Sequence, residues 1–208
     1  GRFALPIIFL GAKLRKKPFI LWTELRMHPQ TLFHQLTFPL VKFIYNKADA
    51  IVVGGTHCKK YLENIGIDSQ KIFIGWNAVN NCLYSVHTSS AELAEIKSKI
   101  GLNNQKIILY VGRLEEVKGL NYLFRAVSEL DREMPVALLV IGSGSCEKKL
   151  RELAANLLLD NVYFLDYIQN DILYKYYALA EVFILPSITT RRVKETWGFV
   201  INEAMNQG

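Results

Sequence analysis

Short apolar segments alternate with segments of helical apolar spacing along most of the 208 residues, and this alternation constrains the fold more than any other feature. The apolar segments have the length of strands, as at residues 50–53, 106–111 and 136–141. Alternating strands and helices form a parallel, doubly wound sheet. Half of the residues are hydrophobic, which is enough to bury a core. The sequence therefore predicts an α/β fold with parallel sheets.

The alternation occurs in two runs, which are separated by the polar segment from Asn80 to Ser90. We place the boundary between residues 85 and 86 and expect two Rossmann-like halves. Both halves are expected to be incomplete, since the chain starts at Gly1 rather than Met and stops directly after a helix. The expected strands are 17–22, 50–53, 71–74, 106–111, 136–141, 162–165 and 182–187. The expected helices are 29–46, 56–65, 91–100, 119–130, 147–158, 173–180 and 199–205.

Near the end of the chain, Glu195 and Glu203 are separated by seven residues, with Trp197 and Gly198 between them. We expect Glu195 in a loop and Glu203 about one turn inside the following helix. Unpaired N–H groups at a helix start favour an anion, and carboxylates accept hydrogen bonds from sugar hydroxyls. The motif therefore indicates a ligand that is part phosphate and part sugar. Hydrolysis by an acid and a base carboxylate is the alternative.

A second candidate motif follows the strand 106–111, where Gly112, Arg113 and Lys118 lead into a helix. In parallel α/β sheets the carboxyl ends of the strands face the ligand crevice. A fixed Arg and Lys there would stabilise a departing nucleoside diphosphate more strongly in the transition state than in the ground state. The alternative is that both are solvated loop residues.

Gly142 and Gly144 end the strand 136–141 and lead into the next helix. They would let a ligand approach the backbone, or they would form only a tight turn. A dinucleotide-binding fingerprint requires a third glycine where Glu147 stands, so that fingerprint is absent.

Taken in order, these motifs resemble the donor-binding half of a family-4 (group 1) retaining glycosyltransferase of GT-B fold. The resemblance rests on residues 110–114 with Lys118 and Gly119, on 140–144, on 185–187 and on 195–205. Residues 48–53 and 71–77 are similar to the end of the N-terminal, acceptor-side domain and to the interdomain linker of that family. The resemblance thus covers most of the chain. It makes residues 1–85 the C-terminal part of the acceptor-side domain with the linker, and residues 86–208 a truncated donor-binding domain.

The resemblance also implies roles for individual residues. Arg113 and Lys118 match the diphosphate-binding pair, Glu195 the glutamate that faces the donor sugar, and Glu203 the glutamate that accepts hydrogen bonds from the ribose. Arg113, Lys118 and Glu195 are thus the candidate catalytic residues, and the nucleobase would rest near Tyr167 and Ile168. The implied donor-binding set is Gly112, Arg113, Lys118, Gly142, Gly144, Ile168, Glu195, Trp197, Gly198, Phe199, Val200 and Glu203.

The resemblance implies that the protein transfers a hexosyl-type sugar from a nucleotide-diphosphate sugar with retention of configuration. It also implies that the reaction needs neither a metal nor a cofactor. The sequence agrees, since it has neither an Asp-X-Asp pair nor a His/Cys cluster. The alternatives are a phosphorylase of the same fold and a non-catalytic module that binds nucleotide, membrane or nucleic acid. The fragment alone is expected to be inactive, because segments of both domains would be missing.

The positive charge is concentrated in the first eighty residues, which hold eleven Lys and Arg against four Asp and Glu, within a net charge of +6. Such a bias suits attraction to anionic lipid head groups or to nucleic acid, or it is merely a solvated surface. We expect a glycan or lipid-linked acceptor in polysaccharide biosynthesis, contacted by Glu24, and no nucleic-acid partner. Three cysteines without short spacing indicate a reducing cytoplasm, and the inner face of the membrane is the expected place of action.

Overall fold

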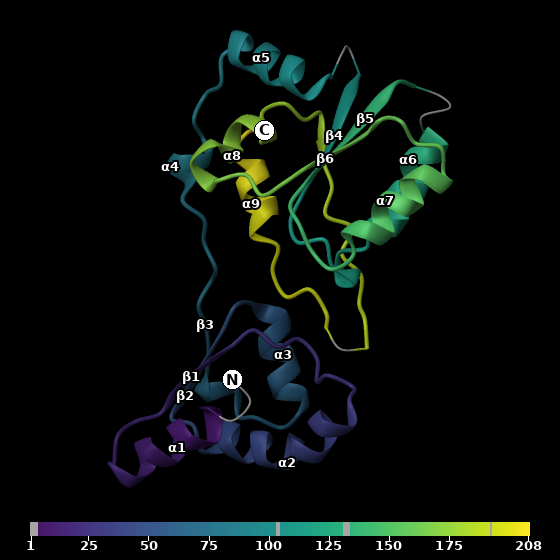
Figure 1. The fold of residues 1–208 in the computed structure, drawn as a ribbon. Helices are drawn as coiled ribbons and strands as arrows, with labels where there is room; N and C mark the ends of the chain where they lie inside the picture. Colours follow the sequence, from purple (N-terminus) through teal and green to yellow (C-terminus); the bar gives the residue numbers. More distant parts are fainter. Residues whose placement is uncertain (1–3, 103–104, 131–133, 192) are drawn as a thin grey trace. The chain divides into compact units, whose positions relative to one another are not determined.

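The computed structural model describes residues 4–102, 105–130, 134–191 and 193–208. Its contacts divide the chain into two compact units, which are described separately below (Figure 1). The first unit comprises Gly1–Asn77 and Thr189–Trp197, and the second comprises Ala78–Ile188 and Gly198–Gly208. The boundary expected between residues 85 and 86 concerns the domains of the whole protein and stays a prediction.

The first unit is built on a parallel three-stranded sheet in the order β1-β2-β3. Its core lies on one face of this sheet, where Ile51 and Val53 are fully buried beneath Ile44 and Leu62. The strands are β1 (Ile20–Thr23), β2 (Ala50–Val53) and β3 (Ile72–Ile74). The helices are α1 (Ala4–Leu14), α2 (Leu32–Lys47), α3 (Thr56–Asn64) and the short 3-10 helix η1 (Ser69–Lys71).

Helix α2 begins later than the expected start at Pro29, because Thr31 caps it. The Thr31 side chain accepts a hydrogen bond from the amide of His34, and this satisfies one of the N–H groups that a helix start leaves unpaired. Helix α1 was not expected. Its residues Leu5, Phe9 and Ala12 pack against the core of the first unit, whereas Ile7 and Leu14 are exposed.

The second unit is a parallel four-stranded sheet in the order β6-β5-β4-β7. Helices pack on both of its faces, with α6 and α7 on one and α8 and α9 on the other (Figure 1). The strands are β4 (Lys106–Val111), β5 (Val136–Ile141), β6 (Val162–Leu165) and β7 (Val182–Phe183). The helices are α4 (Asn81–Tyr84), α5 (Ser90–Ile100), η2 (Glu116–Lys118), α6 (Leu120–Leu130), α7 (Glu147–Asn156), α8 (Asn170–Tyr177) and α9 (Phe199–Met205).

Side chains of β4 alternate between the two faces of this sheet. Tyr110 joins the core beneath α6 and α7 together with Phe124, whereas Leu109 joins the core beneath α8 and α9. Every residue of β5 is buried, as expected for a central strand of a doubly wound sheet. The predicted α/β fold with parallel sheets is therefore confirmed.

In the second unit, the main differences from the expected elements lie at the edge of the sheet and beside it. The strand expected over residues 182–187 is wrong beyond Phe183: only Ile108–Leu109 of β4 pair with Val182–Phe183. Pro186 has no N–H to give to such a ladder. Helix α8 begins at Asn170 rather than near Leu173, and α4 forms inside the segment expected as a linker.

Candidate functional site

Two glycine-containing loops follow β4 and β5, and backbone hydrogen bonds join them. The amide of Gly112 donates to the carbonyl of Ile141 at 3.0 Å, and the amide of Leu114 donates to the carbonyl of Ser143 at 2.9 Å. The amide of Cys146 in turn donates to the carbonyl of Leu114 at 2.9 Å. The pairing of β4 with β5 thus continues beyond the strands. As a result, the loop that carries Arg113 is fixed against its neighbour.

Gly142 and Gly144 are needed for this contact between the loops. A Cβ atom at Gly144 would lie 2.5 Å from the carbonyl oxygen of Leu114, and one at Gly142 would overlap the carbonyl of Gly112. Gly142 also has a φ of 129°, which L side chains rarely adopt. The close approach of the two loops alone therefore explains both glycines. Their contact with a ligand stays a prediction.

Arg113 has an exposed side chain on a backbone that is held from inside the core. The hydroxyl of the fully buried Tyr110 donates a hydrogen bond to the carbonyl of Arg113 at 2.8 Å. Sequence reasoning did not single out Tyr110, because a tyrosine within a buried strand is expected to pack. The bond leaves the guanidinium group exposed while it fixes the point from which that group projects.

Lys118 ends η2, and its amide donates to the carbonyl of Glu115 at 2.9 Å. Gly119 follows with a φ of 66°, close against the carbonyl of Pro186. The amide of Ile188 donates to the carbonyl of Val117 at 2.8 Å. Both cations of the predicted diphosphate pair thus lie on one short loop, whose two ends are fixed.

Glu115 forms a side-chain contact between the same two loops. The Ser145 hydroxyl donates to its carboxylate at 2.8 Å, and the Ser145 amide donates to it at 3.4 Å. These two bonds lower the pKa of the Glu115 carboxyl, and the charge of Arg113 lowers it further. The carboxylate is therefore held in its ionised form beside the predicted diphosphate site.

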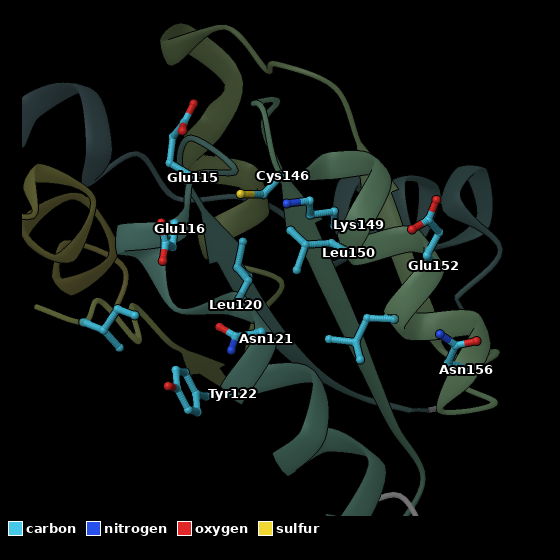
Figure 2. A pocket seen from close by; sticks show the side chains of 12 residues that line it. Glu115, Glu116, Leu120, Asn121, Tyr122, Cys146, Lys149, Leu150, Glu152 and Asn156 are labelled. Atoms are coloured by element: carbon cyan, nitrogen blue, oxygen red, sulfur yellow. The ribbon is translucent and has the colours of Figure 1, made fainter. Parts of the chain in front are cut away.

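A hollow of about 540 Å³ lies on the side of these loops that faces α6 and α7 (Figure 2). Glu115, Cys146 and Lys149 are among the side chains that line it. Of the described residues around it, none belongs to the predicted donor-binding set. The hollow is therefore not lined by the residues predicted to bind the donor.

Glu203 lies in α9 and meets two buried tyrosines. The Tyr177 hydroxyl donates a hydrogen bond to the Glu203 carboxylate at 2.7 Å. Burial raises the pKa of Tyr177, and Glu203 raises it further. For the same two reasons the pKa of Tyr84 is raised to about 12. Glu203 and Tyr177 are far apart in sequence, so no spacing rule indicated this contact.

The remaining predicted donor residues of the second unit are placed by packing. Gly198 precedes α9, where a Cβ would lie 2.5 Å from the Leu185 side chain. Val200 and Ile168 pack against the core beneath α8 and α9, whereas Phe199 is exposed.

Glu195 and Trp197 group with the first unit. The guanidinium of Arg26 donates to the backbone carbonyl of Glu195 at 2.9 Å, and both glutamate and tryptophan are half-buried. Arg26 and Trp197, together with Thr56 at the start of α3, line a hollow of about 170 Å³. Sequence reasoning did not include Arg26.

Glu24, the predicted acceptor-side residue, is also held in the first unit. Its carboxylate accepts a hydrogen bond from the Asn77 side chain at 3.0 Å, and its carbonyl accepts one from the Cys58 thiol at 3.3 Å. These bonds hold Glu24, which follows β1, beside Asn77, the last residue of the segment Gly1–Asn77.

Comparison with known proteins identifies the family. The family described as "Glycosyl transferases group 1" matches residues 93–208, which is more than half of the chain. The chain belongs to the group 1 glycosyltransferases. The predicted group 1 assignment is thereby confirmed, whereas the family-4 assignment and the retention of configuration stay predictions.

Two relatives show how much of a group 1 glycosyltransferase the chain represents. It is 30% identical over 166 residues to an uncharacterised glycosyltransferase of Methanocaldococcus jannaschii, a match that covers 79% of the chain and 41% of the relative. It is 28% identical over 193 residues to the alpha-D-kanosaminyltransferase of Streptomyces kanamyceticus, a match that covers 87% of the chain and 47% of the relative. The chain thus spans less than half the length of each.

Solved structures confirm the fold of this group 1 glycosyltransferase chain. HepE of Anabaena, solved in complex with UDP-glucose, matches with a TM-score of 0.82 and 17% identity over 100% of the chain and 56% of HepE. Sucrose-phosphate synthase of Thermosynechococcus elongatus matches with a TM-score of 0.74 and 21% identity over 96% of the chain and 51% of the synthase. Both matches cover both units.

Two further properties of the group 1 glycosyltransferase chain concern metals and membranes. Within residues 4–102, 105–130, 134–191 and 193–208, no three His, Cys, Asp or Glu side chains gather where they could hold a metal ion. In the same part of the chain, no helix combines the length and the apolar character needed to cross a membrane. The expectation of a metal-free reaction stays a prediction.

Proposed function

We propose that the chain is part of an enzyme that transfers a hexosyl-type sugar from a nucleotide-diphosphate sugar to an acceptor with retention of configuration. The observation that carries this proposal is the Arg113 to Lys118 loop, which places two cations on a backbone fixed by Tyr110 and by the loop after β5. Family membership supports the proposal, and the complex of HepE with UDP-glucose supports this class of donor.

In this proposal Arg113 and Lys118 stabilise the nucleoside diphosphate as it departs. Breaking the bond between sugar and phosphate adds negative charge to the leaving group, so cations placed beforehand stabilise the transition state more than the ground state. Arg113 can bind two phosphate oxygens at once, whereas Lys118 supplies a compact charge. No metal takes part in this step of the proposed reaction.

Glu195 and Glu203 take the sugar and the ribose in the proposed donor complex. Carboxylates accept hydrogen bonds from neutral hydroxyls, whereas the phosphates are bound by the cations. Glu195 orients the donor sugar through its hydroxyls, and Glu203 binds the ribose. Retention of configuration comes from the likeness to the retaining family rather than from any single contact.

The acceptor in this proposal is a glycan precursor or a lipid-linked sugar at the cytoplasmic face of the membrane, in polysaccharide biosynthesis. The first unit supports it through the exposed cations Arg15, Lys16 and Lys17, which follow the apolar helix α1. Cations next to exposed apolar side chains favour peripheral contact with an anionic lipid surface. Glu24 is the proposed acceptor-side residue.

Calorimetry of the full-length protein against uridine, guanosine and adenosine diphosphate sugars, with and without a chelator, tests the donor assignment. We expect one nucleotide series to bind, equally well with the chelator present, and more weakly to the variant Glu203→Ala. If no nucleotide sugar binds the parent protein, the donor proposal is wrong. If binding requires a divalent ion, the metal-free step is wrong.

A further inference from the structure

The contact between Tyr177 and Glu203 is held by packing on the tyrosine side. Tyr177 is 4% exposed, and its ring packs edge-on against Tyr84 and Phe183, with ring centroids 6.2 Å and 5.7 Å away. Its hydroxyl reaches the Glu203 carboxylate at 2.7 Å, a typical distance for an O–H donor and a carboxylate. Packing therefore sets the rotamer of Tyr177. The hydrogen bond in turn holds the Glu203 carboxylate in a fixed position relative to the tyrosine.

The direction of this hydrogen bond is fixed as well. Burial and the Glu203 charge raise the pKa of the Tyr177 phenol, so the hydroxyl keeps its proton and acts as the donor to the carboxylate. An ionised carboxylate has about four acceptor positions on its two oxygens. Tyr177 takes one of them and the phenol of Tyr84 takes a second, so the carboxylate retains two positions that can accept from two hydroxyls of one ligand.

We propose that Tyr177 is a positioning residue that orients the Glu203 carboxylate toward the two adjacent hydroxyls of the nucleotide ribose. The inference rests on the proposed ribose-binding function of Glu203. A vicinal diol donates two nearly parallel hydrogen bonds, so it is bound well only by a carboxylate whose plane is held. Tyr177 would thus contribute to the preference for ribonucleotides over deoxyribonucleotides without touching the nucleotide.

The ratio of affinities for a ribonucleotide and its 2′-deoxy analogue measures this role. The probes are UDP, GDP and ADP, and whichever binds the full-length parent is then compared by calorimetry with its 2′-deoxy form. We expect the parent to prefer the ribonucleotide by about tenfold or more, since a hydrogen bond to a charged group is lost in the deoxy form. Glu203→Gln and Tyr177→Phe should both bring the ratio close to one.

Two controls separate positioning from a structural role. Tyr176→Phe makes the same change at the neighbouring, half-buried tyrosine of α8 and should keep the parent ratio. The double variant Tyr177→Phe with Glu203→Gln should lower the ratio no further than Glu203→Gln alone, because the two residues act through one contact. A purely structural role of Tyr177 would lower the melting temperature and leave the ratio unchanged.

The outcomes distinguish this inference from the proposed function. If no nucleotide binds the parent, or if Glu203→Gln keeps the ratio, the ribose site and this inference both fail. If Glu203→Gln abolishes the preference while a folded Tyr177→Phe retains it, this inference alone is overturned. Should Tyr177→Phe not fold, 4-fluorophenylalanine at position 177 serves in its place, since it keeps the ring and fills the position of the hydroxyl without donating a hydrogen bond; an unchanged ratio would then contradict the inference.

Discussion

The hydroxyl of Tyr110, buried within β4, donates a hydrogen bond of 2.8 Å to the carbonyl of Arg113, three residues further along the chain. This bond joins the core of the second unit to the loop of the predicted diphosphate pair. It fixes the backbone from which the exposed side chain of Arg113 projects. Electrostatic stabilisation of a leaving group depends on such fixed charges, because a charge that must first be ordered loses part of its effect.

Tyr110→Phe should therefore weaken the binding of a nucleoside diphosphate as well as lower the stability of the protein. Loss of the hydrogen bond is expected to cost about 1 kcal/mol of unfolding free energy, and the nucleoside diphosphate should bind several-fold more weakly. Denaturant unfolding and calorimetry measure the two quantities. Tyr122→Phe, at an exposed tyrosine of α6, is the matched control and should change neither. Unchanged diphosphate affinity in a folded Tyr110→Phe variant would show that the bond does not position Arg113.

The Glu115 to Ser145 contact should make the second unit less stable in acid. The pKa of Glu115 is lower in the folded state than its ordinary value of 4.5. The contribution of the contact is therefore complete above the unfolded-state pKa and is lost as the pH falls through the folded-state pKa. The melting temperature of the parent should exceed that of Glu115→Gln at neutral pH, and the gap should close in acid. The exposed Glu116→Gln serves as control; a gap that stays constant down to pH 2 would contradict the role of the charge.

Gly144→Ala should destabilise the protein and loosen the loop pair. An added methyl group would meet the backbone of Leu114 at 2.5 Å, and overpacking of this kind costs about 1–3 kcal/mol. Gly11→Ala provides the opposite control: this glycine lies inside α1 with nothing within 4 Å, so alanine should stabilise the helix by roughly 0.5–1 kcal/mol. Thermal unfolding of both variants measures the difference. Equal stability of Gly144→Ala and the parent would mean that the two loops are not packed as described.

The ion pair between Lys175 and Glu92 joins α8 to α5, with a distance of 2.8 Å between nitrogen and oxygen. Lys175 first, and then the bonds from Ser89, lower the pKa of Glu92 from 4.5 to about 2. The stabilisation is therefore present above pH 4.5 and is lost as the pH falls toward 2. Lys175→Met should lower the melting temperature at neutral pH, by an amount that shrinks in high salt and disappears near pH 2. Lys97→Met, at a half-buried lysine of α5, is the control, and a salt-independent effect of Lys175→Met would argue against the ion pair.

Local sequence patterns determine most of this fold. The strands Ala50–Val53, Lys106–Val111, Val136–Ile141 and Val162–Leu165 coincide with the expected ones, because each is an apolar run bounded by polar or turn residues. The expected strand over residues 182–187 is too long, since its pairing with β4 ends at Phe183. Helix α1 was missed because apolar residues surround it and give no clear helical face.

The candidate site, too, could be predicted from the sequence only in part. Motifs indicate Arg113, Lys118 and Glu203, because their order and spacing along the chain are themselves the signal. The residues that hold them, Tyr110 and Tyr177, were missed, since each is a buried aromatic residue whose partner becomes visible only after folding. Residues that support a site are thus harder to predict than residues that form it.

Binding of a nucleoside diphosphate compared with the nucleoside alone tests the central claim most directly. With the full-length protein and the nucleotide series that binds it, the combined variant Arg113→Ala and Lys118→Ala should lose at least about a hundredfold in affinity for the diphosphate, since two charge-assisted contacts are removed. The same variant should bind the nucleoside as the parent does, and Arg125→Ala, at an exposed arginine of α6, should behave as the parent toward both. Parent-like affinity of the double variant for the diphosphate would contradict the assignment of this loop as the phosphate side of the donor site.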